Sequence, residues 1–326
     1  MQNFLDPAIL FFVFGVLAGF ARSNLEIPQA ISRFLSLYLL MALGLKGGFA
    51  LNKSGLTPEV AISLGTAILL AVVIPLIGYA LLRRVVSGFD AAAVAATYGS
   101  VSAVTFITAT QYLDNNGQPF GAHMAAAMAL MESPAIIMAV LFANMLRRER
   151  AAANPSGQHA TTPLGKILHE SFTDGAQLLL LGAMLVGIIT GDAGKTVMAP
   201  FSVDLFKGML SFFLLDMGLM AARNMHELRG KSPWLVAYGI AGPITHASLA
   251  LGLCVLFGIP AGDGALLMVL AASASYIAVP AVLRFALPEA NPGLYFGLSL
   301  GLTFPLNILF GIPVYVAVAQ AVLGGN

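Results

Sequence analysis

The chain contains very little charge. Only 10% of its 326 residues are Asp, Glu, Lys or Arg, and 58% are hydrophobic, whereas a soluble domain carries about 25% charged residues. So few charges could not keep a surface in water, which excludes a soluble enzyme. The formal net charge of +1 also excludes an electrostatic nucleic-acid binder, because such a protein needs a clustered basic face.

Cysteine and the usual catalytic motifs are also scarce. The one cysteine, Cys254, lies in an apolar run, so there is no disulfide framework. No pair of histidines has metal-ligand spacing, and no G-x-x-x-x-G-K-[ST] loop indicates that ATP supplies energy. No motif places a base beside a serine, as an intramembrane hydrolase would require. We therefore expect no enzyme activity, no metal centre and no cofactor.

Apolar residues, glycine and proline are abundant. The mean hydropathy is +0.87, and there are 34 glycines and 17 prolines. In a chain this apolar, that composition favours close helix packing and broken helices over disorder. The sequence therefore predicts an all-α polytopic membrane protein.

Apolar runs suitable for membrane helices occur along the whole sequence. A spanning helix needs roughly 20 apolar residues, and on this basis we predict ten helices: Pro7–Ala21, Gln29–Leu51, Pro58–Leu82, Phe89–Leu113, Gly121–Leu146, Phe172–Thr190, Pro200–Ala222, Pro233–Phe257, Asp263–Leu287 and Leu294–Leu323. The one long polar connection divides them into residues 1–146, a linker at 147–171, and residues 172–326.

The basic residues predict how the chain is oriented. Twelve of the 16 Lys and Arg residues follow odd-numbered predicted helices, and only Lys53, Lys195 and Lys207 lie at the opposite ends. The positive-inside rule then places the linker in the cytoplasm and both termini outside. We expect a multi-pass protein of the inner (plasma) membrane.

The two halves of the sequence share short motifs in the same order. Gly99-Ser-Val-Ser102 is matched by Ala272-Ser-Ala-Ser275, and Leu43-Gly-Leu45 by Met217-Gly-Leu219. Because each half has an odd number of predicted helices, the second copy would insert upside down. Inverted repeats with broken helices are typical of secondary transporters. The alternative is that apolar helices of similar composition merely look alike.

The middles of the fourth and ninth predicted helices are the least apolar. Gly99 and Pro280 permit breaks there, and Pro280 frees a carbonyl near Tyr276. Facing breaks would expose helix N-termini that suit a small anion. The segments also supply the Val101 backbone and the hydroxyls of Ser100, Ser102, Thr105, Ser273 and Ser275. The alternative is that serine and glycine only allow close packing.

Three charged residues fall inside predicted helices: Lys46, Glu132 and Asp216. Such residues are costly in a bilayer and are expected to face one another or a wet cavity. They predict either a structural ion pair or a role in coupling to Na⁺ or H⁺. For His246 we expect a packing role, with proton relay as the alternative. Lys207 lies near a helix end, where its side chain is expected to reach the membrane surface.

These segments resemble the sodium-dependent bicarbonate permeases of the SbtA type. The similarity runs in order over nearly the whole chain, through Gly44-Leu-Lys-Gly-Gly48, Gly99-Ser-Val-Ser102, Met131-Glu-Ser-Pro-Ala135, Glu227-Leu-Arg229, Ala271-Ala-Ser-Ala-Ser275 and Pro288-Glu-Ala-Asn-Pro292.

The resemblance implies a ten-helix inverted repeat with a core and a gate domain, assembled as a homotrimer. It implies that bicarbonate is held between the breaks by backbone N–H groups and hydroxyls of Gly99, Ser102, Thr105, Ser273 and Ser275. A PII-like regulatory partner is known in the family, but the central loop of this chain is short.

The chain departs from the family at the positions that bear on the coupling ion. Family members have an aspartate in the segment where this chain has Tyr276, and an uncharged residue where it has Lys46. They carry a glutamate at Met220, whereas this chain offers Asp216 a turn earlier. We hypothesise that the Lys46 ammonium replaces a bound cation, which would make transport sodium-independent or proton-coupled.

The leading interpretation is a secondary transporter that imports bicarbonate with a sodium or proton gradient. The alternatives are a permease for another small anion or carboxylate, a proton/cation antiporter, and a membrane receptor or scaffold.

Overall fold

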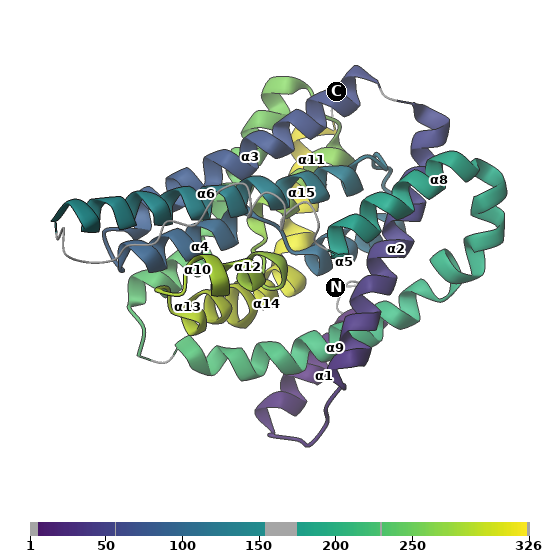
Figure 1. Ribbon diagram of the computed structural model, residues 1–326. Coiled ribbons are helices and arrows are strands. Elements are labelled where there is room, and N and C mark those ends of the chain that lie inside the picture. Colours follow the sequence, from purple (N-terminus) through teal and green to yellow (C-terminus); the bar gives the residue numbers. More distant parts are fainter. Residues whose placement is uncertain (1–5, 56, 154–174, 229, 325–326) are drawn as a thin grey trace.

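The computed structural model describes residues 6–55, 57–153, 175–228 and 230–324. The described chain is helical and contains no strand (Figure 1). Its first half contains α1 (Pro7–Phe20), α2 (Gln29–Ser54), α3 (Pro58–Leu82), α4 (Gly88–Gly99), α5 (Ala103–Asn115) and α6 (Met124–Ala153). The start of the predicted linker thus continues α6, while its remainder, 154–171, lies outside the described residues.

The second half begins with α8 (Gly175–Ala199), the π-helical turn η2 (Pro200–Asp204), α9 (Phe206–Met225) and the 3₁₀ turn η3 (His226–Leu228). It continues with α10 (Pro233–Phe257), α11 (Ala261–Ala272) and α12 (Ala278–Ala286). The last helical stretch consists of α13 (Pro292–Phe296), η4 (Gly297–Thr303), α14 (Phe304–Leu306), η5 (Asn307–Gly311) and α15 (Ile312–Leu323).

Seven helical stretches of the described chain are long and apolar enough to cross a membrane. Pro7–Phe20 and Ala261–Ala272 are shorter apolar helices, and the sixth and seventh predicted spans join into one stretch, Leu178–Leu228. They join because the chain turns within α8, at Gly191 with φ of 53°, and continues as helix. The all-helical membrane character is confirmed, and the prediction of ten spans is not.

The helices form two groups. Helix α1 packs along α9, and α2 packs along α8; these four lie together on one side of the molecule (Figure 1), and we call them the four-helix layer. The other group contains α3 to α6 and α10 to α15. Because it holds the interrupted helices α4–α5 and α11–α12, we call it the broken-helix unit.

Glycines allow the close crossings within the four-helix layer. A Cβ on Gly15 of α1 or on Gly218 of α9 would lie 2.3 Å from a backbone oxygen of the partner helix. At the α2–α8 crossing, a Cβ on Gly48 would lie 2.1 Å from such an oxygen, and one on Gly187 would lie 2.7 Å from one. Both crossings therefore use small residues to bring backbones into contact, as membrane helices commonly do.

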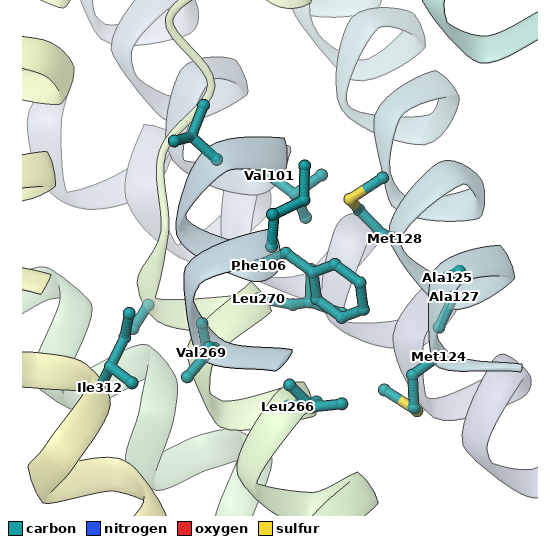
Figure 2. Close-up of a cluster of buried hydrophobic side chains, with 14 of the residues drawn as sticks. Val101, Phe106, Met124, Ala125, Ala127, Met128, Leu266, Val269, Leu270 and Ile312 are labelled. Atoms are coloured by element: carbon teal, nitrogen blue, oxygen red, sulfur yellow. The ribbon is translucent and has the colours of Figure 1, made fainter. Parts of the chain in front are cut away.

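The broken-helix unit has helix α11 at its centre. Every residue of α11 from Gly262 to Ala272 is buried, so its end is shielded from lipid. Figure 2 shows part of the apolar packing around it, contributed by α5, α6, α11, α15 and the segment between α4 and α5: Val101, Phe106, Met124, Met128, Leu266, Val269, Leu270 and Ile312. The interrupted backbone thus lies inside protein, where non-helical segments are tolerated in a membrane.

The loop between α12 and α13 contains the predicted Pro288-Glu-Ala-Asn-Pro292 motif and is held by polar contacts. Arg147 of α6 donates from Nε and Nη2 to the Glu289 carboxylate at 2.9 and 2.8 Å, and from Nη2 to the Ala286 carbonyl at 2.8 Å. The Asn291 N–H donates to Asp90 at 2.8 Å. These bonds join this loop to the end of α6 and the start of α4.

We predict that Gly218→Ala destabilises the protein by about 1–3 kcal/mol, because its Cβ would overlap the α1 backbone at 2.3 Å. The measurement is thermal unfolding of the purified protein in detergent. Gly208→Ala is the matched control in the same helix, because nothing lies within 4 Å of its Cβ position. Equal stability of the two variants would contradict the importance of the α1–α9 contact.

Candidate functional site

The first break separates α4 from α5. Helix α4 ends at Gly99, where a Cβ would lie 2.2 Å from the Pro75 ring of α3, and Ser100 and Ser102 are extended. Ser102 then caps α5, since its Oγ accepts the Thr105 N–H at 3.2 Å and the Thr105 hydroxyl at 2.9 Å. The break therefore lies where the Gly99-Ser-Val-Ser102 run predicts it.

The second break separates α11 from α12. Helix α11 ends at Ala272, and α12 begins at Ala278. Pro280 falls in the first turn of α12, where its missing N–H costs no helical hydrogen bond. The Ser275 Oγ accepts the Val279 N–H at 3.3 Å. This break also lies in the predicted segment.

The two breaks contact each other directly. The Ser102 N–H donates to the Ser273 Oγ at 2.9 Å, and the Ser275 N–H donates to the Thr97 carbonyl at 2.8 Å. The Ser273 hydroxyl itself donates to the Leu270 carbonyl at 2.8 Å. The predicted site residues of the two segments are all buried: Gly99, Ser100, Val101, Ser102, Thr105, Ser273, Ser275 and Tyr276. The structure thus brings together two segments far apart in the sequence.

Several polar atoms at this junction are buried without a hydrogen bond from the described residues. They are the Ser100 Oγ, the Tyr276 hydroxyl and the Asp216 Oδ2. Tyr276 lies beside Ser102 and interacts electrostatically with Asp216, and Asp216 of α9 is only 6% exposed. Buried polar atoms are rarely left unpaired. These three atoms are therefore consistent with a binding site in which a polar ligand supplies the hydrogen-bond partners.

Lys46 lies elsewhere. It lines a cavity of about 290 Å³ between α2 and α5, together with Thr110, Asp114 and Gln118. Its Nζ is 4.4 Å from the centre of the Phe206 ring, and it interacts electrostatically with Asp114. Asp114 is 12 residues beyond Ser102, or about 18 Å along a helix. Lys46 is therefore associated with the far end of α5, not with the breaks.

Glu132 and His246 lie on two further helices. Glu132 lies on α6, which packs against α3, α4 and α12, and it is partly buried. His246 of α10 is 4% exposed, lies beside Ala271 near the end of α11, and has rings of Tyr98 and Tyr238 at centroid distances of 6.3 and 6.2 Å. This setting is that of a histidine packed among aromatic rings.

Asn307 is a site residue that the sequence analysis missed. Its Nδ2 donates to the Ala272 carbonyl, the last of α11, at 2.8 Å, and its Oδ1 accepts the Tyr315 hydroxyl at 3.2 Å. An amide inside the apolar Phe304–Pro313 run was the available signal. Asp114 was missed because it lies just beyond the end of a predicted span.

No group of three or more His, Cys, Asp or Glu residues in the described chain could hold a metal ion. Sodium is a different case, because oxygen atoms of hydroxyls, carbonyls and single carboxylates suit a hard cation. The junction offers the neighbouring hydroxyls of Ser102 and Tyr276, and Tyr276 interacts electrostatically with the Asp216 carboxylate.

A known protein family matches this chain. The profile of the Na⁺-dependent bicarbonate transporter superfamily matches residues 7–320, nearly the whole chain. The chain belongs to the Na⁺-dependent bicarbonate transporter superfamily. No match is found among curated proteins.

Membership in the Na⁺-dependent bicarbonate transporter superfamily confirms the resemblance that the sequence predicts. It implies Na⁺-dependent bicarbonate transport, with bicarbonate and Na⁺ as the transported species, and transporters are not an enzyme class. Together with the apolar helices, it identifies a multi-pass membrane protein.

We predict that Asn307→Ala lowers the free energy of unfolding by about 1–3 kcal/mol, because it leaves the Ala272 carbonyl at the break buried without a donor. Thermal unfolding in detergent measures the effect. Tyr315→Phe serves as the comparison, since it removes only the 3.2 Å bond to the Asn307 Oδ1 and is expected to cost less. If Asn307→Ala unfolds at the same temperature as the wild-type protein, the amide does not stabilise the end of α11.

Proposed function

We propose that this chain is a secondary active transporter that imports bicarbonate at the junction of its two helix breaks, coupled to a sodium gradient. The observation that carries the proposal is the contact between the breaks, in which Ser102 and Ser273 are hydrogen-bonded at 2.9 Å inside a chain of this superfamily. Substrate sites at facing broken helices near the membrane midplane are a known arrangement of secondary transporters.

The N-terminus of α5 supplies donors for an anion. The first N–H groups of any helix have no acceptor within the helix, and here they belong to Ala103 and Val104, directly after Ser102. Their partial positive charge, with that of α12 in the other half, suits one negative charge. Hydroxyls of Ser100 and Ser102 add donors without adding a full charge, while the Thr105 hydroxyl already donates to the Ser102 Oγ. This combination fits a small monovalent oxyanion.

Asp216 is our choice for the residue that binds the coupling ion. It lies on α9 and interacts electrostatically with Tyr276, which belongs to the segment in which family members have an aspartate. Its Oδ2 is buried without a hydrogen bond, although the carboxylate also interacts with Ser32 and with the charge of Arg223. A cation or a proton at Oδ2 would satisfy the remaining oxygen. We propose that Na⁺ fills this role, held by Asp216 together with hydroxyls of Ser102 and Tyr276.

The hypothesis that the Lys46 ammonium replaces a cation stays a competing proposal. The cavity that Lys46 shares with Asp114 supports a role near the end of α5 more than one at the breaks. Proton coupling through Asp216 or Glu132 is the corresponding alternative for the ion.

We further propose that the two halves are inverted repeats. The two crossings of the four-helix layer support this, because Gly15 and Gly218 meet in one, and Gly48 and Gly187 meet in the other. The repeat motifs align Gly44 with Gly218, so the small residues of the two crossings occupy corresponding stretches. The resemblance adds a homotrimer and a PII-like regulatory partner, for which the central loop of this chain is short. The positive-inside rule adds a cytoplasmic linker.

We predict that purified wild-type protein in liposomes takes up labelled bicarbonate faster with an inward sodium gradient than without sodium. Asp216→Asn is expected to abolish most of this sodium stimulation, because it removes the charge that would bind the cation. The matched control is Asp192→Asn, since Asp192 forms an exposed ion pair with Lys53 at 2.8 Å. Lys46→Ala is measured alongside, with and without sodium.

Other outcomes of this uptake experiment would change the coupling ion or the substrate that we assign. Bicarbonate uptake that ignores sodium, and that gains sodium dependence in Lys46→Ala, would replace our proposal with the Lys46 hypothesis. Uptake stimulated by an inward proton gradient instead of sodium would identify H⁺ as the coupling ion. Folded wild-type protein that takes up no bicarbonate would contradict the proposal and favour a different small anion.

A further inference from the structure

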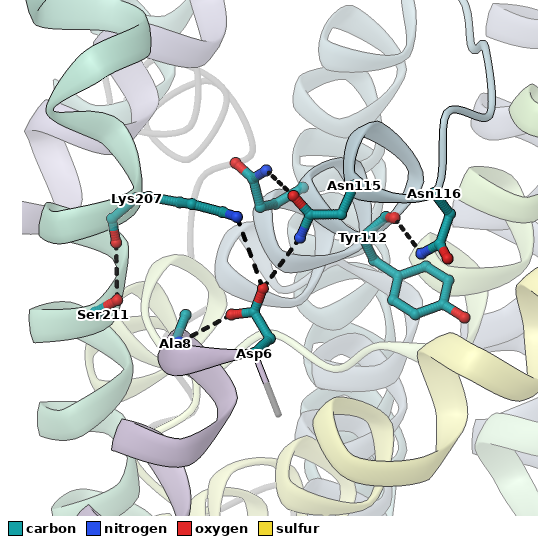
Figure 3. A network of polar contacts seen from close by, with 8 residues as sticks. Asp6, Ala8, Tyr112, Asn115, Asn116, Lys207 and Ser211 are labelled. Atoms are coloured by element: carbon teal, nitrogen blue, oxygen red, sulfur yellow. Dashed lines mark hydrogen bonds and ion pairs between the residues drawn. The ribbon is translucent and has the colours of Figure 1, made fainter. Parts of the chain in front are cut away.

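A second polar cavity flanks α5 on its other side, facing α1 and α9. Its volume is about 380 Å³, and its lining includes Asp6, Thr108, Gln111, Asn115 and Lys207. Figure 3 shows the Lys207, Asp6 and Asn115 side chains converging there from α9, the start of α1 and the end of α5. The cavity therefore lies between the four-helix layer and the broken-helix unit.

The Asp6 carboxylate is held in place by donors other than the lysine. Its Oδ1 accepts the Ala8 N–H at 2.9 Å, and its Oδ2 accepts the Asn115 amide at 3.0 Å. Asn115 is oriented in turn by Gln111, whose Nε2 donates to the Asn115 Oδ1 at 2.9 Å. Both carboxylate oxygens thus have a hydrogen-bond partner without Lys207.

Lys207 is bound loosely by comparison. Its Nζ lies 3.9 Å from the Asp6 Oδ2, and its side chain is 52% exposed. A charge-assisted N–H···O bond has a length of about 2.7–2.9 Å, so the ammonium keeps donors for another acceptor. The cavity therefore offers a cation with free donors, beside a carboxylate whose oxygens are already bonded.

The cavity extends toward the breaks. Thr108 lies in its lining, one helical turn beyond Thr105, whose hydroxyl bonds to Ser102 at 2.9 Å. Three residues of helix correspond to about 4.5 Å. An anion at Lys207 would thus be at the far end of a polar face of α5 that leads to the junction.

We propose that Lys207 forms an outer docking site for a small monovalent oxyanion, which holds the anion before it reaches the breaks. Asp6 competes with this anion for the ammonium and so keeps its binding weak enough for release. This inference rests on the proposed function, because the docked anion is of the same class as the transported one. The side with few basic residues, which holds Lys53, Lys195 and Lys207, is the one predicted to face outward.

Transport kinetics give the first test. Lys207→Gln is expected to raise the KM for bicarbonate about fivefold, the factor for one unit-charge contact of about 4 Å in water, with kcat unchanged. Asp6→Asn is expected to lower KM, because it frees the ammonium while an asparagine still caps α1. Lys53→Gln is the control, since Lys53 is an exposed lysine on the same side, paired with Asp192 outside this cavity.

A labelling experiment tests the site without transport. The native Cys254 is buried, so Asn116→Cys places one accessible thiol at the cavity lining. The quantity measured is the labelling rate of an anionic methanethiosulfonate divided by that of a cationic one. The positive charge of Lys207 is expected to raise this ratio, and Lys207→Gln is expected to lower it about threefold to tenfold. Bicarbonate, but not gluconate, is expected to slow labelling only when Lys207 is present.

The outcomes separate the two proposals. If wild-type protein transports bicarbonate but Lys207→Gln and Lys53→Gln have the same KM, the docking site is overturned and the proposed function stands. If wild-type protein transports no bicarbonate, the labelling experiment alone tests the docking site. Protection by bicarbonate that depends on Lys207 would then support the docking site, and protection that is absent or independent of Lys207 would overturn it.

Discussion

The structure depends on the requirement that backbone polar groups inside a membrane be satisfied by protein. Two interrupted helices create ends that lipid cannot solvate, and here the first break is bonded to the second across the two halves of the chain. Ser102 donates to Ser273, and Ser275 donates to the Thr97 carbonyl. Asn307 closes the remaining end of α11. Either break alone would leave unpaired backbone groups inside the membrane. The two breaks therefore form one feature of the fold.

The same requirement explains why the broken helices lie where they do. Helix α11 is buried on all sides, and the four-helix layer lies on one side of the unit that contains it (Figure 1). That layer needs no polar interior, because its glycines let α1 approach α9 and α2 approach α8 closely. The polar residues that connect the layer to α5 lie instead at two cavities, one with Lys46 and Asp114 and one with Asp6 and Lys207.

Much of this arrangement could be predicted from local sequence. Gly99, Pro280 and the adjacent serines indicate both breaks because their effects on a helix depend on near neighbours. The partners of charged residues were harder to predict. Lys46 interacts with Asp114, which is distant in sequence and belongs to the end of a helix that hydropathy alone does not delimit. The count of ten spans stays a prediction, since the sixth and seventh predicted spans join into one helical stretch through a turn at Gly191 inside α8.

The distance in sequence between the two breaks also affects how the protein is made. Ser102 and Ser273 are 171 residues apart, and at bacterial or eukaryotic rates of synthesis that separation takes roughly 10–35 s. During that interval the first break is already in or near the membrane while its hydrogen-bond partners have not left the ribosome. The nascent first half must therefore hold its unpaired backbone in water or within the insertion machinery, so this junction is completed late in biogenesis.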